Sequence, residues 1–356
     1  MKIAFFSKHL PSDEPNGVSV QVHRLAEGLA GKGHSVTVFT FSPPVEGAVY
    51  RCVTLPQHRR SRSVGKFIPA FVFRKTDTAG FDIVHYHGDD YFCRGSKRRI
   101  RTFYGSALME AVHARSFGRF CYQALFYVFE WISCLRKGHT VAISADTSRY
   151  LPPVREHIPC CVPLDRYCPE GAKSTHPSIL FLGDFTSRKR GLLMVQAFSS
   201  EVLPVFPLCI LTVVGPVPCG GPGIRYAGRC GEDELIRLYR ESWVFCMPSS
   251  YEGFGVPVVE AMACGTAVVA TVNAGSSTLI RGGVDGLLCT PELLGSTLVK
   301  MLGDDGLRGR LAQEGVRTAG QYGSTTVTGR YEQLYHRAVG ACAEVRVNEE
   351  GVQKSR

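Results

Sequence analysis

The sequence predicts an α/β protein of two domains, each with a central parallel sheet. A length of 356 residues suggests two domains of roughly 150 residues each. Hydrophobic residues make up 44% of the chain and charged residues 20%, as in ordinary globular proteins. Short apolar runs alternate with stretches of helical spacing along both halves, which is typical of parallel βαβ units.

In the first half, short apolar runs predict strands at Lys2–Ser7, Ser35–Thr40, Asp82–His87, Ile100–Tyr104 and Thr140–Ser144. The helix expected between the first two strands spans Val18–Lys32, because its apolar residues recur with helical spacing. Gly33 follows directly, where a glycine commonly ends a helix.

Three prolines between His157 and Pro169, with no helical period, place a domain boundary there. We expect an N-terminal domain over 1–165, a C-terminal domain over 170–325, a helix over 326–342 that packs back on the first domain, and a disordered tail over 343–356. The second domain has predicted strands at Ser178–Gly183, Cys209–Gly215, Ile224–Ala227, Val244–Pro248, Ala267–Val272 and Gly286–Cys289. Its predicted helices are Gly191–Val202, Glu232–Glu241, Pro257–Ala263 and Pro291–Leu302.

Several classes of protein are disfavoured by the sequence. The apolar run Ile3–Phe6 is too short for a secretory signal, and no apolar stretch is long enough to span a bilayer. A cytoplasmic protein is therefore expected. The fourteen cysteines form no C-x-x-C and no other metal-ligand spacing, so we expect reduced, structural cysteines and no metal.

Positive charge is concentrated in the first half. Residues 1–165 carry 22 Lys and Arg against 13 Asp and Glu, with basic runs at Arg59–Arg62 and Lys97–Arg101. Such patches attract lipid head groups, nucleic acid or phosphorylated acceptors, whereas a merely solvated face is the alternative. No nucleic-acid-binding motif accompanies the runs, so nucleic acid is not an expected partner.

The strongest functional signal lies between Ser249 and Gly265. A strand is followed by a glycine-containing turn and then by a helix with Pro257 in its first turn. This arrangement presents the backbone N–H groups of Phe254, Gly255 and Val256, at a helix N-terminus that favours anionic or hydroxyl-rich ligands.

Two glutamates eight residues apart bracket this turn. Glu252 is expected on an exposed turn, and Glu260 in the first turns of the helix, where its carboxylate can accept two hydroxyl hydrogen bonds. The alternative is a helix N-terminus with a favourable carboxylate nearby.

This segment resembles the E-x7-E motif of family 4 glycosyltransferases. Gly265–Ala270, Ala274-Gly275 and Asp285–Leu288 continue the pattern, as do Lys2–Phe6, Asn16–Ser19 and Gly33–Val38 near the N-terminus. The resemblance, which extends over about residues 1–340, implies the GT-B fold: two Rossmann-like domains facing across a cleft. It also implies retention of anomeric configuration by front-side substitution, which depends on electrostatic stabilisation of a leaving diphosphate.

The resemblance assigns roles to single residues. Glu252 matches the motif glutamate near the transferred sugar, and Glu260 the one that binds ribose. Gly17 starts the first helix, and its missing Cβ would let backbone approach a phosphate; an ordinary turn glycine is the alternative.

A diphosphate also needs cations, which Arg188, Lys189 and Arg190 supply on a strand-to-helix loop. The sequence departs from the family twice here, with Asp184 at one expected cation position and Arg190 at the other. A solvated charge run at a helix start is the alternative interpretation.

The acceptor side departs from the family as well. Many relatives carry a catalytic-site histidine where this sequence has Tyr104, and tyrosine, with an ordinary pKa of about 10, is a poor base at neutrality. The role passes to His87, or to an acidic group such as Asp89. Glu252, His87 and Tyr104 are thus the candidate catalytic residues.

The resemblance implies a hexosyltransferase-like enzyme with a nucleotide-sugar donor, a sugar or lipid-linked acceptor, and no cofactor. It would act in glycolipid, polysaccharide or cell-envelope glycan synthesis. Two alternatives stay open: a sugar-nucleotide epimerase of the same fold, which lacks the E-x7-E, and a non-enzymatic relative that binds nucleotide sugar. Intact Glu252, Glu260 and the basic loop argue against the second alternative, whereas Asp184 and Tyr104 lend it some weight.

The segment Phe117–Lys137 is a predicted helix with an apolar stripe and with Arg115, Arg119, Arg136 and Lys137 at its flanks. It fits a helix in an anionic membrane interface, which would make the protein peripheral at the inner membrane face. It also fits an ordinary core helix packed on the sheet, which is the commoner role of aromatic residues at helical spacing.

Overall fold

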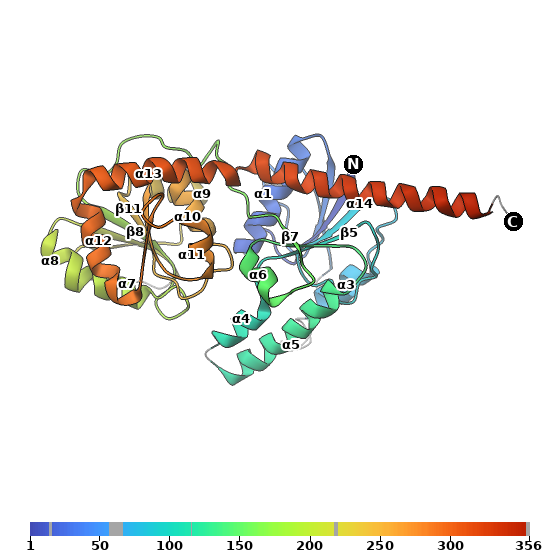
Figure 1. Ribbon diagram of the computed structural model, residues 1–356, viewed down its shortest axis with the longest axis horizontal. Helices are drawn as coiled ribbons and strands as arrows, with labels where there is room; N and C mark the ends of the chain where they lie inside the picture. Colours follow the sequence, from blue (N-terminus) through green and yellow to red (C-terminus); the bar gives the residue numbers. More distant parts are fainter. Residues whose placement is uncertain (14–15, 57–66, 115, 217–219, 354–356) are drawn as a thin grey trace. The chain divides into compact units, whose positions relative to one another are not determined.

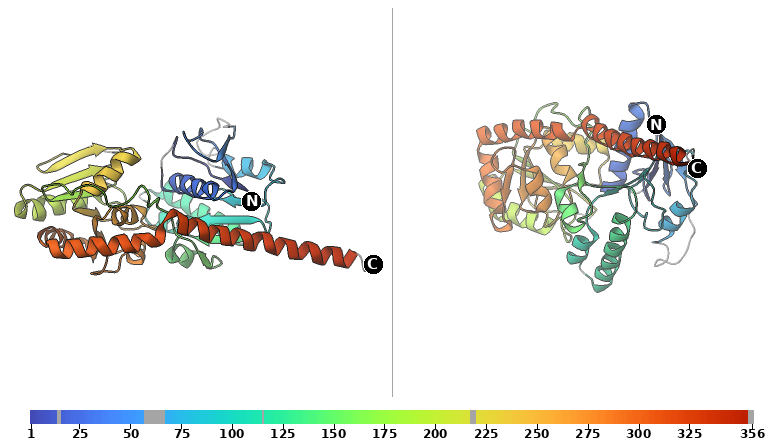
Figure 2. Two further views of the ribbon diagram at one scale, coloured as in Figure 1. Left: turned by 90° about the horizontal axis from the view of Figure 1, so that it is seen from above. Right: turned by 45° about the vertical axis from the view of Figure 1, so that its right-hand side comes forward.

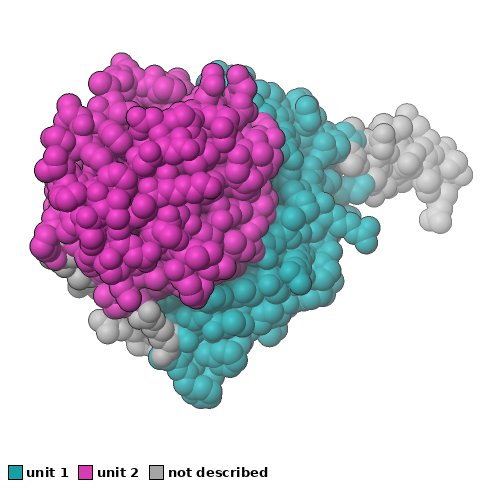
Figure 3. Space-filling model, turned by 60° about the vertical axis from the view of Figure 1, so that its left-hand side comes forward, with its two compact units in different colours: residues 1–161, 324–356 teal, residues 162–323 magenta. Residues whose placement is uncertain are grey.

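The protein is described here by a computed structural model that covers residues 1–13, 16–56, 67–114, 116–216 and 220–353, with backbone alone over 341–353. The chain forms two compact units, coloured in Figure 3: unit 1 comprises residues 1–161 and 324–356, and unit 2 residues 162–323. Each unit is a parallel α/β structure, which confirms the predicted fold class. The basic run Arg59–Arg62 and the flanking Arg115 lie outside the described residues.

Unit 1 is built on a parallel sheet with the strand order β3-β2-β1-β4-β5-β6-β7. The strands are β1 Lys2–Phe6, β2 Ser35–Thr40, β3 Arg51–Thr54, β4 Ile83–Tyr86, β5 Arg99–Phe103, β6 His139–Ala142 and β7 Glu156–His157. The central strands are buried, whereas β3 is only partly buried at one edge and β7 has two residues at the other. The sequence predicts the five inner strands and misses both edge strands.

The helices of unit 1 are α1 Gly17–Gly31, α3 Ile68–Lys75, α4 Ala107–Val112, α5 Phe117–Cys134, α6 Ala145–Tyr150 and α14 Ser324–Gln353. The start of α1 is set by Asn16, whose side chain accepts hydrogen bonds from the N–H groups of Val18 and Ser19. Its apolar face, including Val22, Leu25 and Leu29, packs into the core of unit 1.

Unit 2 repeats this architecture with the strand order β10-β9-β8-β11-β12-β13. Its strands are β8 Ser178–Leu182, β9 Ile210–Val214, β10 Ile224–Gly228, β11 Val244–Met247, β12 Ala267–Thr271 and β13 Leu287–Cys289. Its α-helices are α7 Gly191–Ala197, α8 Leu203–Val205, α9 Glu232–Glu241, α10 Val256–Ala263, α11 Ala274–Leu279, α12 Leu294–Gly303 and α13 Asp305–Ala319. The predicted helix Gly191–Val202 is divided, because a π-helical segment, Phe198–Val202, follows α7.

Helix α14 returns to unit 1 and packs along α1, as Figures 1 and 2 show. Its Tyr331, Leu334 and Tyr335 are buried in the same core cluster as the apolar face of α1. Glu332 of α14 pairs with Lys32 at 2.9 Å. The helical backbone continues to Gln353, where the sequence predicts a disordered tail from 343. Residues 343–353 contain no proline, which would break a helix, and their single glycine, Gly351, lies near the end of the helical backbone.

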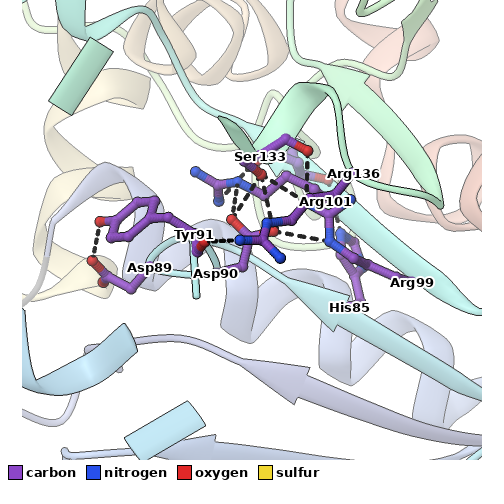
Figure 4. Close-up of polar contacts among 9 residues, drawn as sticks. His85, Asp89, Asp90, Tyr91, Arg99, Arg101, Ser133 and Arg136 are labelled. Carbon is purple, nitrogen blue, oxygen red and sulfur yellow. Dashed lines mark hydrogen bonds and ion pairs between the residues drawn. The ribbon is translucent and has the colours of Figure 1, made fainter. Parts of the chain in front are cut away.

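A buried carboxylate ties the loop after β4 to β5 and α5 (Figure 4). Asp90, which is fully buried, accepts a hydrogen bond from Arg99 Nε at 3.0 Å and lies 3.2 Å from Arg101 Nε. Ser133, near the end of α5, donates to the same carboxylate at 2.8 Å. Two guanidinium groups and one hydroxyl therefore compensate the cost of removing this charge from water.

Helix α5 presents very different surfaces on its two sides. Its inner aromatic residues, Phe126 and Phe129, contact Tyr91, and Phe129 also contacts Phe92. Only Ser133 and Cys134 of the helix are buried. One side of α5 therefore packs on the unit, as in a core helix, while its other side is exposed.

We predict that Asp90→Asn destabilises unit 1 by about 3–5 kcal/mol, because two buried guanidinium groups lose their anion. Urea unfolding followed by Trp131 emission, in a Trp243→Phe background, would report on unit 1 alone. The matched control is Asp13→Asn, an exposed carboxylate 3.9 Å from His9, for which about 0.5 kcal/mol or less is expected. Equal unfolding midpoints for Asp90→Asn and the parent would contradict the prediction.

Candidate functional site

Each predicted site residue lies in a loop or helix that follows a strand of one of the two parallel sheets. In unit 2, the loop with Arg188 follows β8 and the loop with Glu252 follows β11, and these two strands are paired neighbours. In unit 1, Gly17 starts the helix after β1, while His87 and Tyr104 follow the paired strands β4 and β5. Ligands of open α/β sheets bind at the carboxyl ends of the strands.

In unit 2, the structure brings Arg188, Lys189 and Glu252 into one ion-paired group. Lys189 Nζ lies 2.6 Å from one carboxylate oxygen of Glu252, and Arg188 Nη1 lies 2.7 Å from the other. Arg188 also donates to the carbonyl oxygen of Tyr251 at 2.8 Å, and Ser250 N donates to the carbonyl oxygen of Arg188 at 2.8 Å. The two loops are thus joined through backbone and side-chain contacts.

The sequence predicts Glu252 on an exposed turn, but the structure places it in a buried position. Its exposed fraction is 5%, while its partners Arg188 and Lys189 are partly exposed. A carboxylate can be buried here because two cations compensate its desolvation. This pairing joins residues 63 positions apart, which local sequence patterns cannot reveal.

The electrostatics of this group set the ionisation of Glu252. Burial alone would raise its pKa, but the charges of Lys189 and Arg188, together with their hydrogen bonds, outweigh burial and lower the pKa to about 2. Glu252 is therefore an anion throughout the physiological range. Two cations and one anion leave a net positive charge at this end of the sheet, which suits an anionic ligand.

Asp184, which replaces an expected cation, has a structural role in the cationic loop. Its Oδ1 accepts hydrogen bonds from the N–H groups of Thr186, at 3.1 Å, and Ser187, at 2.6 Å. Its Oδ2 accepts one from Ser187 Oγ at 2.6 Å. The aspartate thus shapes the turn that carries Arg188 and Lys189 toward Glu252.

Arg190 occupies a different position from its two neighbours. It precedes α7 in the left-handed conformation, with φ 52°, and in the described contacts it is not part of the group around Glu252. A left-handed conformation is costly for a residue other than glycine and is retained where surrounding structure or function requires it.

The turn before α10 forms as the sequence suggests. Gly255 adopts a left-handed φ of 100°, and α10 begins at Val256 with Pro257 in its first turn. Phe254 is buried, with its ring 5.5 Å from that of Tyr322. Glu260 lies on the second turn of α10 and accepts a hydrogen bond from the Tyr239 hydroxyl at 3.1 Å. Sequence reasoning missed Tyr239, since only the packing of α9 on α10 brings it there.

Gly17 has space around it in unit 1. A Cβ built on this residue would meet nothing within 4 Å in the described structure. Neither crowding nor a positive φ therefore explains the glycine. The open space above the start of α1 is compatible with a ligand that approaches the backbone closely.

His87 and Tyr104 contact each other in unit 1, with 2.8 Å between Nδ1 of the imidazole and the phenol oxygen. Burial, reinforced by the charge of Arg101, lowers the pKa of His87 to about 3, so the imidazole is neutral. Burial raises the pKa of Tyr104 well above its ordinary value, so the phenol keeps its proton. His87 Nε2 is buried and has no hydrogen-bond partner among the described residues.

His85 connects this pair to α14. Its ring centre is 4.0 Å from that of His87, and its Nδ1 lies 2.7 Å from the hydroxyl of Tyr335. Its Nε2 lies 2.8 Å from Thr102 Oγ1. The sequence predicts no role for His85 beyond its strand, and its alternation with His87 is the only signal in the sequence. Its hydrogen bonds to two elements orient the surroundings of His87.

Asp89, the acidic alternative to His87, lies in the left-handed region with φ 56°. Burial raises the pKa of its carboxyl, and the Tyr91 hydroxyl donates a hydrogen bond to it. No group of three or more histidine, cysteine or acidic side chains is placed to hold a metal ion in the part of the chain that the structure describes. The twelve cysteines whose side chains the structure describes are all free thiols.

Two family models match the chain. Residues 15–166 match the model described as Glycosyltransferase Family 4, and residues 176–304 the model described as Glycosyl transferases group 1. The chain is 25% identical, over 94% of its length and 97% of the relative, to the phosphatidyl-myo-inositol mannosyltransferase of Mycobacterium tuberculosis. It is 41% identical to the D-inositol 3-phosphate glycosyltransferase of Salinispora arenicola over 31% of this chain and 25% of that relative.

Solved structures share the fold over almost the whole chain. Sucrose-phosphate synthase of Thermosynechococcus elongatus matches with a TM-score of 0.79 at 20% identity, over 96% of this chain and 99% of that one. Anabaena HepE in complex with UDP-glucose matches with a TM-score of 0.73 at 14% identity, over 94% of this chain and 98% of that one. At such identities these matches establish the fold alone.

The lowered pKa of Glu252 predicts an acid-sensitive contribution to the stability of unit 2. The pKa falls from 4.5 to about 2 on folding, so the contribution is complete above pH 4.5 and is lost as pH falls through about 2. It amounts to about 3 kcal/mol at most, and less after solvent screening of the partly exposed cations.

Glu252→Gln should therefore lose less stability than the parent between pH of about 6 and about 3. Urea unfolding followed by Trp243 emission, in a Trp131→Phe background, would report on unit 2. Glu241→Gln, on the exposed surface of α9, is the matched control and should behave like the parent. Parallel pH profiles for Glu252→Gln and the parent would show that the ion pairs do not support the fold.

Proposed function

Because the chain belongs to glycosyltransferase family 4 and has the GT-B fold, we propose that it is a retaining enzyme that transfers a sugar from a nucleotide-sugar donor to a hydroxyl acceptor. The observation that carries this proposal is the buried Glu252 between Arg188 and Lys189, next to the start of α10. An anion between two cations at the carboxyl ends of β8 and β11 can serve both parts of a donor, the diphosphate and the sugar.

The donor binds to unit 2 in this proposal. Its diphosphate contacts Arg188, Lys189 and Arg190 together with the N–H groups at Phe254–Val256, where the helix N-terminus also favours negative charge. Its ribose hydroxyls donate to Glu260, whose carboxylate is oriented by Tyr239. Gly17 of unit 1 lets the backbone approach a phosphate oxygen. The UDP-glucose bound by the structurally similar HepE is one example of such a donor.

Binding of the diphosphate changes the partners of Glu252. Both cations pair with Glu252 in the present structure, so phosphate oxygens compete with the carboxylate for them. As Arg188 and Lys189 turn toward the phosphates, Glu252 becomes available to the transferred sugar. The cost of loosening the two ion pairs is offset by charge-assisted bonds to the diphosphate.

In the reaction, the bond between the anomeric carbon and the diphosphate oxygen breaks, and the acceptor oxygen bonds to the same face of the sugar. The cations stabilise the charge that develops on the leaving diphosphate. His87 is a poor proton acceptor, since its pKa is about 3. We therefore assign it, with Tyr104, to orienting the acceptor hydroxyl, whose proton passes to the leaving diphosphate.

The acceptor is, in this proposal, a lipid-linked or phosphorylated polyol or sugar, used in glycolipid or cell-envelope glycan synthesis at the cytoplasmic face of a membrane. Two observations support it: the excess of nine positive charges over residues 1–165, and relatives whose names specify phosphatidyl-myo-inositol and inositol 3-phosphate. Phosphate on the acceptor would complement the charge of unit 1.

We expect Glu252→Gln to lower the turnover of sugar transfer by about 100-fold or more, which is typical of lost electrostatic stabilisation. Its affinity for nucleoside diphosphate should not fall, because the substitution removes the anion that competes for Arg188 and Lys189. Turnover is measured by chromatography of donor and products, and calorimetry measures the affinity.

Glu241→Gln is the control on the surface of the same unit. Near-parental turnover in Glu252→Gln would refute the assignment of Glu252. Conversion of the donor into its epimer, without transfer to any acceptor, would instead establish the epimerase alternative.

A second experiment tests the cationic loop. Replacing Arg188, Lys189 and Arg190 by Ala should weaken binding of nucleoside diphosphate by about 2–4 kcal/mol. Because these replacements would leave Glu252 buried and unpaired, they are best made in the Glu252→Gln background, which then serves as the reference. Calorimetry with UDP, GDP and ADP in turn identifies the base.

Arg237→Ala in the same background controls for the loss of positive charge, since Arg237 lies on α9 and pairs with Glu234 and Glu241. Affinities that do not differ between the triple variant and its reference would exclude the loop from donor binding.

A further inference from the structure

The outer side of α5 carries an unusual surface in unit 1. Its residues recur at helical spacing and form what we call the α5 stripe: Phe117, Phe120, Cys121, Leu125, Val128, Ile132 and Leu135. Among them, Phe117 is 81% exposed, Val128 53% and Leu135 73%. The stripe spans about 27 Å along the helix axis. An unbroken exposed apolar row of this length requires a partner.

No charged side chain interrupts the α5 stripe. The charged residues of α5, Arg119 and Glu130, lie on the side that faces α4. Arg119 pairs with Glu110 of α4, and the Glu130 carboxylate accepts the N–H of Ala107 at the start of α4. All the charge of the helix is therefore directed at its neighbour, and the outer side is apolar throughout.

The exposure of the α5 stripe does not come from a loosely held helix. The inner side of α5 is occupied by aromatic contacts, and Ser133 is bound to the buried Asp90–Arg99 pair. Figures 1 and 2 show α4 and α5 projecting together from the sheet of unit 1. The contacts on the inner side hold α5 in place, so the α5 stripe faces outward. The stripe is not needed for packing within unit 1.

The charges around the helix indicate an anionic partner. Residues 91–145 contain nine Lys and Arg against the two acidic residues Glu110 and Glu130. Arg99 and Arg101 are buried against Asp90, and Arg119 pairs with Glu110, so the positive excess comes from the remaining cations. Near the C-terminal end of α5, Lys137 packs closely on Gly95, which brings the loop with Arg94 and Lys97 to the same end. Arg94 and Lys137 are exposed. An apolar row with cations beside it matches the acyl chains and head groups of an anionic lipid surface.

Other occupants fit less well. A second copy of the chain would place one basic surface against another, since the same cations accompany both stripes. A transmembrane arrangement finds no support either, because no helix in the described part of the chain has the length and apolar character needed to cross a bilayer.

We propose that unit 1 docks on anionic bilayers through the α5 stripe, with the helix parallel to the membrane plane and its basic end among the head groups. This inference rests on the proposed lipid-linked acceptor, which it would bring to the same surface as the enzyme. The binding is reversible, because a single interfacial helix buries limited apolar area.

The test uses the full chain and vesicles of phosphatidylcholine with or without phosphatidylglycerol, in a flotation assay. The parent should float with anionic vesicles at low salt, and binding should fall severalfold when salt is raised to about 0.5 M. The variant Val128→Glu/Ile132→Glu should bind at least about tenfold more weakly, since two apolar side chains no longer enter the lipid.

The matched control is Val205→Glu/Leu208→Glu, which places the same two charges on exposed apolar positions of unit 2, at 55% and 65% exposure. It should bind vesicles like the parent. Circular dichroism and unchanged nucleoside-diphosphate affinity would show that both variants are folded.

The docking surface would be overturned if the parent did not float with anionic vesicles at low salt, or if both pairs of substitutions weakened binding equally. It would also be overturned if the parent were a dimer that bound no vesicles and that Val128→Glu/Ile132→Glu converted to monomers. Docking without transfer of sugar to any acceptor would overturn the proposed function and leave the docking surface intact. Transfer of sugar to soluble acceptors without docking would overturn the docking surface and leave the proposed function intact.

Discussion

The carboxylate of Asp90 organises the part of unit 1 that is built from β4, β5 and α5. It lies beyond the end of β4, is neutralised by two arginines from β5 and is held by Ser133 of α5. Because a buried anion cannot give up any of these partners cheaply, the three elements have little freedom relative to one another. The same constraint orders the chain just after His87 and supports the inner side of α5, so the candidate acceptor residues and the exposed stripe both depend on it.

Much of the fold could be predicted because the sheets are buried. Strands such as Val244–Met247 and Ala267–Thr271 are short, largely apolar runs that are buried throughout. The edge strands were not predictable in the same way: Arg51–Thr54 is polar and half-exposed, and Glu156–His157 is too short to show a period. The π-helical turn at Phe198–Val202 could not be predicted either. Its residues keep helical spacing, and only the backbone hydrogen bonds change, from i→i+4 to i→i+5.

The candidate site was less predictable than the fold. Residue types and strand ends located Glu252, Glu260 and the cationic loop, because neighbouring parallel strands end at the same edge. The burial of Glu252 was not predictable, since it depends on an ion pair with Lys189 across 63 residues. Tyr104 and His87 follow neighbouring strands, and their contact could have been inferred from strand order, but the loss of basicity of His87 comes from its depth in the packed unit.

The path of the chain has a consequence for synthesis on the ribosome. Unit 2 is a continuous segment, whereas unit 1 needs α14, whose Tyr331, Leu334 and Tyr335 complete its core. As the chain emerges N-terminus first, unit 2 has its entire sequence before unit 1 does. The first 161 residues must therefore wait, with the surface later covered by α14 still open to water and to chaperones. The domain that begins first is the one that finishes last.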